Sequence, residues 1–205
     1  MDGRLAFGAV LAIPLLYGLL HLLTGWLPPL VGAGLGLVAY WATLGAVLAR
    51  QDRDGLLALA QARSPGRLAA VLLALPVIAL GAVTMRLLGT VVLPAHLLLA
   101  AGLAAILHAV LEELFWRGAL WPRPDPGPAA LALGLYWAFH LAWLGAQGVS
   151  TGLAPHLAVM APLALGGVWT AARLLSGTLG VSILAHAGLN LFLFTGLLAQ
   201  SGAAG

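Results

Sequence analysis

Two adjacent glutamates, Glu112 and Glu113, stand in the middle of an apolar run, and they are the only glutamates in the 205-residue chain. Arg117 follows Glu113 by four residues, so on a helix the two side chains share one face and can neutralise one another. Burying such a pair costs less than burying either charge alone. Glu112 has Trp116 at the equivalent position and points about 100° away around the helix axis, which leaves its carboxylate free for chemistry.

Two other apolar segments carry polar groups that suit the same site. His186 and Asn190 are four residues apart, so a helix presents them on one face as two hydrogen-bond donors to one point. His140 stands in a third segment, and His108 precedes Glu112 by four residues on the same helix face, where it can tune that carboxylate. A lone histidine in a membrane helix is more often a hydrogen-bond partner between helices, and this interpretation is applied to His21, His96 and His156.

The composition identifies the surroundings of these groups as a lipid bilayer. Hydrophobic residues make up 62% of the chain and charged residues 7%, with a mean hydropathy of +1.05, which is typical of a membrane protein with several spans. All nine basic residues are arginines, which form no basic patch with interleaved aromatic residues, so we expect no nucleic-acid partner. The absence of cysteine excludes disulfides, thiolate metal ligands and a cysteine nucleophile.

The chain contains seven segments that approach the length of about 20 apolar residues needed to cross a membrane. We expect these spans at residues 5–23, 30–49, 68–87, 91–121, 129–147, 154–172 and 178–198. The fourth is too long for a simple span, so we expect it to tilt, to protrude or to break near Pro94. The predicted fold is an all-α, polytopic transmembrane helix bundle that forms one integral membrane domain over residues 1–205.

The arginines predict an orientation for this bundle. If the N-terminus is cytoplasmic, the positive-inside rule is satisfied by most of them: Arg4, Arg50, Arg53, Arg63, Arg67, Arg123 and Arg173. Arg86 alone argues against this orientation. The loop from 50 to 67 contains a short leucine-bearing piece that either lies along the membrane surface or is a solvated loop. We expect the first span to be retained, because no clear cleavage site follows a short apolar core.

The predicted spans bring the polar residues of three helices to one depth. At a rise of 1.5 Å per residue, about 12 to 18 Å separates the cytoplasmic ends of their spans from Glu112, His140, His186 and Asn190. Polar groups at this depth are costly, so each needs a partner, a water-filled cavity or a function.

Three motifs in this layer resemble those of the CAAX protease and bacteriocin-processing (CPBP, or Abi) family of glutamic intramembrane proteases. Residues 112–117, EELFWR, resemble its first motif, EExxxR; residues 136–140, YWAFH, its second, FxxxH; and residues 186–190, HAGLN, its third, HxxxN. The resemblance covers about residues 90–198. Tyr136 stands where the family usually has phenylalanine, and the seven predicted spans differ from the eight of many members.

The resemblance implies an endopeptidase that hydrolyses a peptide bond without a covalent intermediate. It assigns Glu112 as the general base and His140 as its partner in activating a water. It assigns His186 and Asn190 to stabilising the oxyanion of the tetrahedral intermediate. This scheme requires no metal and no other cofactor.

The resemblance also implies supporting residues, a substrate class and a location. Glu113 and Arg117 would form a supporting ion pair, with Tyr136 and His108 beside the site. The substrate would be a membrane-associated or lipidated peptide or protein that reaches the site laterally or from the cytoplasmic face. We expect the protein in the cytoplasmic (inner) membrane of a prokaryote.

Two other classes of function stay open on the sequence. Glu112 together with His108, His140 and His186 could surround zinc in an intramembrane zinc protease, although the HExxH pairing is absent. The buried charges could instead form a proton relay or a packing network in a non-enzymatic immunity, scaffold or transport protein. Such a relay does not require a His-xxx-Asn donor pair that faces a free carboxylate, so the protease hypothesis is favoured.

Overall fold

The computed structural model describes residues 1–150, 152 and 154–201 of the chain. These residues form helices and connecting loops without any strand. Seven of the helices are long and apolar enough to cross a membrane, which identifies an integral membrane protein and confirms the predicted all-α, polytopic bundle. They are α1 (Gly3–Trp26), α2 (Pro29–Leu48), α4 (Arg67–Leu88), α5 (Ala95–Glu112) continued by η1 (Glu113–Ala119), α6 (Pro126–His140) continued by η2 (Leu141–Gly145), α7 (Pro155–Ser176) and α8 (Gly180–Gln200).

The helix boundaries follow local signals in the sequence. The Asp2 carboxylate accepts the backbone N–H groups of Arg4 and Leu5 at 2.8 and 3.1 Å and so caps α1. Prolines occupy the first turns of α2, α6 and α7, where their missing N–H groups cost nothing. The long fourth segment breaks at Pro94, so its span runs over 25 residues, from 95 to 119. This break is one of the outcomes expected for that segment.

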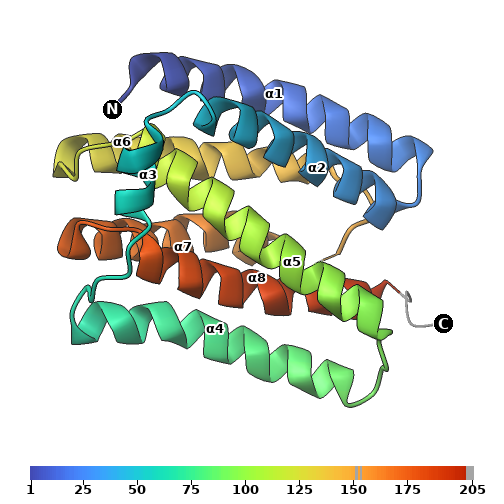
Figure 1. The fold of residues 1–205 in the computed structure, drawn as a ribbon. Helices are drawn as coiled ribbons and strands as arrows, with labels where there is room; N and C mark the ends of the chain where they lie inside the picture. Colours follow the sequence, from blue (N-terminus) through green and yellow to red (C-terminus); the bar gives the residue numbers. More distant parts are fainter. Residues whose placement is uncertain (151, 153, 202–205) are drawn as a thin grey trace.

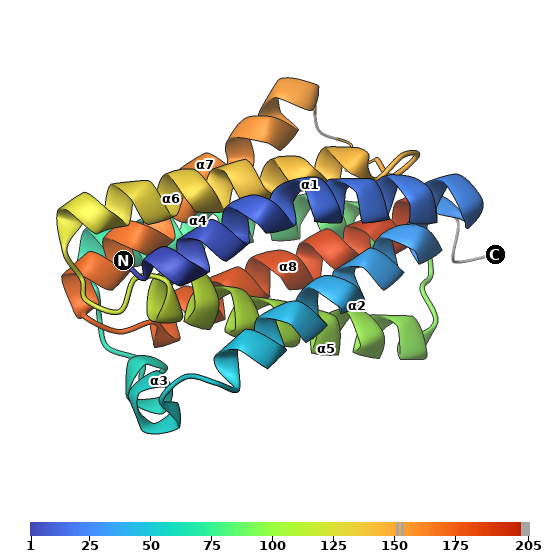
Figure 2. The same cartoon turned by 90° about the horizontal axis from the view of Figure 1, so that it is seen from above.

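The helices lie side by side in an elongated bundle, with α5 crossing it diagonally (Figures 1 and 2). α5 packs along α8, and α4 packs on the other side of α8. α1 pairs with α2 and also contacts α6 and η2, while α6 pairs with α7. Each of the helices that carry the three sequence motifs, α5, α6 and α8, therefore packs against at least two other helices.

The arginine-bearing connections gather at the end of the bundle where the chain begins (Figure 1). There the Asp2 backbone N–H donates to the Leu120 carbonyl at 2.9 Å, and that of Leu179 donates to the Leu59 carbonyl at 2.7 Å. Arg86 lies near the opposite end, close to the end of α4. This separation agrees with the positive-inside rule, and the cytoplasmic position of the arginine-rich end stays a prediction.

The leucine-bearing piece between α2 and α4 is a short helix, α3 (Arg53–Leu59), that packs on the end of the bundle. Its Leu56 and Leu59 side chains lie against Gly118 of η1. Leu57, between them in the sequence, is exposed. The segment is thus a packed helix and not a solvated loop.

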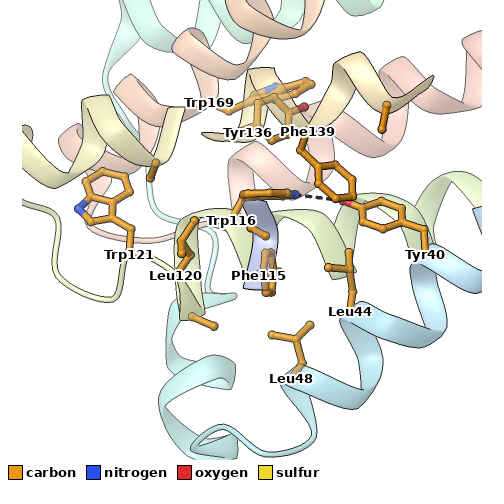
Figure 3. Packing of buried hydrophobic residues seen from close by; sticks show 14 of the residues in the cluster. Tyr40, Leu44, Leu48, Phe115, Trp116, Leu120, Trp121, Tyr136, Phe139 and Trp169 are labelled. Atoms are coloured by element: carbon orange, nitrogen blue, oxygen red, sulfur yellow. Dashed lines mark hydrogen bonds between the residues drawn. The ribbon is translucent and has the colours of Figure 1, made fainter. Parts of the chain in front are cut away.

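A cluster of buried hydrophobic residues contains several aromatic rings that pack against one another (Figure 3). Tyr40 of α2 and Phe139 of α6 stack with ring centroids 4.9 Å apart, and the Trp116 ring lies 5.2 Å from Phe139. All three side chains are buried. Association of helices in lipid depends on such close van der Waals packing, so these rings fix the relative rotation of α2, η1 and α6.

Candidate active site

The polar layer begins where α5 changes into a π-helix. The seven residues of η1 (Glu113–Ala119) form this wider helix, and the Leu120 N–H donates five residues back to the Phe115 carbonyl at 2.8 Å. Single turns of π-helix inside α-helices are rare and occur frequently at functional sites. Glu112 ends α5 and Glu113 begins η1, and both side chains are fully buried.

Glu113 belongs to a closed ionic network. Its Oε1 accepts hydrogen bonds from Nη1 of Arg117 and from Nδ1 of His186, both at 3.0 Å. The guanidinium also lies 4.1 Å over the ring of Tyr136 and donates to the Gly166 carbonyl at 3.4 Å. The Glu113–Arg117 pair predicted from the spacing is therefore present, and it gains a third member from α8.

The two oxygens of the Glu112 carboxylate have different surroundings. Oε1 accepts the Tyr40 hydroxyl at 2.7 Å and lies 3.5 Å from Nε2 of His108 and 3.8 Å from Nε2 of His140. Oε2 lies 3.8 Å from Nε2 of His186 and has no hydrogen-bond partner among the described residues. Three imidazoles from three helices thus converge on one carboxylate.

In His140 and His108, the hydrogen bond made by Nδ1 determines whether Nε2 presents a proton or a lone pair to Glu112. Nδ1 of His140 lies 2.8 Å from the Tyr136 carbonyl, which can only accept, so a neutral His140 presents the Nε2 lone pair to the carboxylate. The Trp41 indole N–H, which can only donate, lies 3.0 Å from Nδ1 of His108. A neutral His108 therefore presents Nε2–H. The hydrogen bonds thus make His140 an acceptor and His108 a donor toward the site.

The face of α8 supplies the remaining donors. The His186 ring stacks on Trp169 of α7, with centroids 4.0 Å apart and an interplanar angle of 16°. Asn190 follows one turn later, is buried, and its Nδ2 has no hydrogen-bond partner in the described part of the chain. A buried amide without a partner is available to donate to a bound group.

The structure gathers most of the residues proposed from the sequence into one cluster. Side-chain contacts between charged groups, and the contact of the guanidinium with an aromatic ring, join the following residues: Glu112, Glu113, Arg117, His108, His140, His186 and Tyr136. Asn190 is placed by its position on α8, and its Nδ2 makes no hydrogen bond to Glu112 or to any other described residue. The histidines interpreted as unrelated to the site stay outside it: His96 and His156 are exposed, and His21 contacts Gln147.

Three residues of the cluster carry no motif, and sequence reasoning missed them: Tyr40, Trp41 and Trp169. The signal that could have identified the first two is the one used for the histidines. Tyr40 and Trp41 bring polar atoms into the middle of the second predicted span, where polar atoms need partners.

An apolar cleft of about 320 Å³ lies between α1 and α2 beside this cluster. Small residues such as Gly8 and Ala12 leave the space open, and Arg4 lies at one end of it. The wall toward the cluster includes Tyr40 and Phe139. The Tyr40 side chain therefore lines the cleft and also contacts the Glu112 carboxylate through its hydroxyl.

Part of the cluster also has the spacing of a metal site. His108, Glu112 and His186 each offer a ligand atom, and these atoms lie within 4.8 Å of one another. The Trp41 hydrogen bond opposes this use of His108, because it occupies Nδ1 and leaves the proton on Nε2. Metal binding here requires the loss of that bond or of that proton.

A family model matches part of the chain. Residues 94–192, just under half of the chain, match the family model described as type II CAAX prenyl endopeptidase Rce1-like. The matched range contains all three sequence motifs, so the resemblance inferred from them is confirmed. No curated protein and no solved structure matches the chain.

Proposed function

We propose that this chain, a member of the Rce1-like type II CAAX prenyl endopeptidase family through residues 94–192, is an intramembrane endopeptidase of the glutamic type. Protease activity is what the family implies, and the use of Glu112 as the base is our inference. One observation supports it above the others: three imidazole Nε2 atoms lie 3.5 to 3.8 Å from this fully buried carboxylate.

The nucleophile in this proposal is a water activated by Glu112 and His140. Both groups present acceptors, the carboxylate oxygen and the Nε2 lone pair, and a water has two protons to donate. With both protons engaged, an oxygen lone pair of the water is directed at the carbonyl carbon of the substrate. Glu112 takes one proton during the attack and later delivers it to the leaving amine. General-base catalysis of this kind contributes about 10²- to 10⁴-fold.

His186 and Asn190 stabilise the oxyanion that this attack creates. Asn190 offers its unpartnered Nδ2, and His186 offers Nε2 while its Nδ1 donates to Glu113. A histidine that donates from both nitrogens is an imidazolium. Its positive charge and that of Arg117 then balance the two buried carboxylates, which favours this state in an apolar bundle. One oxyanion donor typically contributes about 10²- to 10³-fold.

The proposed substrate is a membrane-associated peptide or protein with a lipid chain near the bond that is cut. The cleft between α1 and α2 is apolar, and its volume of about 320 Å³ lies within the range of ligand pockets. We place the lipid chain there and the peptide next to Glu112. The peptide enters from the arginine-rich end, which we assign to the cytoplasm of a prokaryote, and the whole chain acts as one membrane domain.

The test is cleavage of a fluorogenic, farnesylated peptide that ends in a CAAX sequence, by the purified protein in liposomes. We expect Glu112→Gln to lower kcat by about 10³-fold or more, because it removes the base and keeps the shape. Asp125→Asn, a matched change at an exposed carboxylate that makes no cap hydrogen bond to α6, should have no effect. A chelator should leave cleavage unchanged.

Two results would replace this proposal by one of its alternatives. Equal cleavage by the wild type and Glu112→Gln would remove Glu112 as the base and support a scaffold or transport role for the buried charges. Loss of cleavage on chelation, restored by zinc, would assign the reaction to a metal held by His108, Glu112 and His186.

A further inference from the structure

Two consecutive residues of α2, Tyr40 and Trp41, reach the polar cluster from outside the range that matches the family. The Tyr40 hydroxyl donates to Oε1 of Glu112 at 2.7 Å, and the Trp41 indole donates to Nδ1 of His108 at 3.0 Å. Neighbouring residues of a helix point about 100° apart, so α2 contacts two different side chains of α5 from one position.

The Tyr40 hydroxyl is itself oriented by its surroundings (Figure 3). The Trp116 indole N–H donates to the Tyr40 oxygen at 3.0 Å, and Phe139 stacks on the ring. Since the indole nitrogen only donates, the hydroxyl proton of Tyr40 is left for Glu112. The phenol is thus a donor whose direction is fixed by two aromatic side chains.

Trp41 acts on Oε1 of Glu112 indirectly, through the side chain of His108. Its hydrogen bond holds the His108 proton on Nε2, which lies 3.5 Å from Oε1 of Glu112. Tyr40 and His108 therefore both donate toward Oε1. Oε2 is left without a partner among the described residues, on the side of His186.

We propose that Tyr40 and Trp41 are positioning residues that give the two oxygens of the Glu112 carboxylate different roles. They anchor Oε1 and keep Oε2 as the oxygen that exchanges protons with the water. This inference rests on the proposed function of Glu112. An unanchored carboxylate rotates about its last side-chain bond, and a displacement of about 1 Å can cost about 100-fold in rate.

The first experiment measures kcat and KM separately for Tyr40→Phe and Trp41→Phe with the farnesylated fluorogenic peptide in liposomes. Both variants keep a ring and delete one donor. We expect Tyr40→Phe to lower kcat about 10- to 100-fold and Trp41→Phe about 3- to 10-fold, with KM within about twofold of wild type. The matched controls are Tyr17→Phe and Trp26→Phe, whose side chains are 45% and 80% exposed, and they should retain wild-type kcat.

A double-mutant cycle tests whether Trp41 acts through His108. In a His108→Leu background, Trp41→Phe should cause no further loss of kcat, because the side chain that it orients is absent. Independent, multiplicative losses would overturn the assignment of Trp41. A kcat for Tyr40→Phe equal to that of wild type, alongside an inactive Glu112→Gln, would overturn the assignment of Tyr40 and leave the proposed function standing.

A second readout requires no cleavage and separates the two proposals. ¹⁵N spectra of histidine-labelled protein in detergent report which ring nitrogen of His108 carries the proton, with His108→Leu identifying the signal. We expect the Nε2–H form in wild type and a mixture of forms in Trp41→Phe. An Nδ1–H form in wild type overturns the positioning role of Trp41 and leaves the proposed function standing. Cleavage that persists in Glu112→Gln overturns the proposed function, and the proton-exchange role of Oε2 falls with it.

Discussion

The N-terminal helices α1 to α4 and the C-terminal helices α5 to α8 contribute different kinds of groups to the same cluster. The C-terminal helices supply its two carboxylates, its arginine and its three histidines. The N-terminal helices supply two neutral donors, Tyr40 and Trp41, and most of the lining of an apolar cleft. The motif-bearing half thus holds the groups proposed to react, and the other half orients them and faces the lipid chain.

The physical reason for this division is the cost of charge in lipid. A buried carboxylate needs compensating groups within a few ångströms, and Glu113 finds them on its own span and on α8. Neutral donors need only one hydrogen bond each and can come from a helix without other polar groups. The C-terminal half is therefore interdependent, whereas the N-terminal contributions can be deleted one at a time.

Among substitutions that test this difference between the two halves, removal of the Arg117 side chain should have the largest effect on stability. Arg117→Met leaves Glu113 buried without its guanidinium partner, and we expect a loss of about 3 to 5 kcal/mol of stability. Thermal unfolding in detergent, followed by tryptophan fluorescence, measures it. The double variant Glu113→Gln/Arg117→Met should lose less than the single one. Arg86→Met, at an exposed arginine, is the control and should leave the stability unchanged. A double variant that is less stable than Arg117→Met would contradict the view that Arg117 compensates the buried charge of Glu113.

The junction between the two halves should be the next most sensitive place. A Cβ on Gly180 at the start of α8 would lie 2.6 Å from backbone atoms of Ala60, Gln61 and Ala62, so the loop after α3 has to move. We expect Gly180→Ala to cost about 1 to 3 kcal/mol in the same unfolding measurement. Gly134→Ala, inside α6 with open space around the added Cβ, is the matched control and should be neutral or slightly stabilising. Equal stability of the two variants would show that the loop after α3 can move away from residue 180 at little cost in free energy.

Filling the cleft should have the smallest effect and should change only substrate binding. We expect Ala12→Leu to raise KM for the farnesylated peptide about 10-fold, equivalent to about 1.4 kcal/mol, with kcat unchanged. Cleavage of the same peptide without its prenyl group should not change. Ala46→Leu, on the exposed side of α2 outside the cleft, serves as the control. A parallel rise in KM for both peptides would place the lipid chain elsewhere.

Much of the bundle could be predicted from the sequence because hydropathy alone encodes it. The seven expected spans match seven helices, and the break at Pro94 follows from the lost N–H and the fixed φ of proline. The Glu113–Arg117 contact follows from a spacing of four. The π-helix from Glu113 to Ala119 was not predicted, because no residue type marks where an α-helix widens.

The sequence by itself determined which segments are long and apolar enough to cross a membrane, and it predicted a shared depth for the polar residues, since both depend on distances along one chain. Only the tertiary structure decided that Oε1 of Glu112 is anchored and Oε2 is free, that Trp41 orients His108, and that Trp169 supports His186. These contacts depend on how each helix is rotated about its axis. Spans that are apolar on nearly every side carry no periodic signal for that rotation, and it is set by the packing of aromatic side chains between helices.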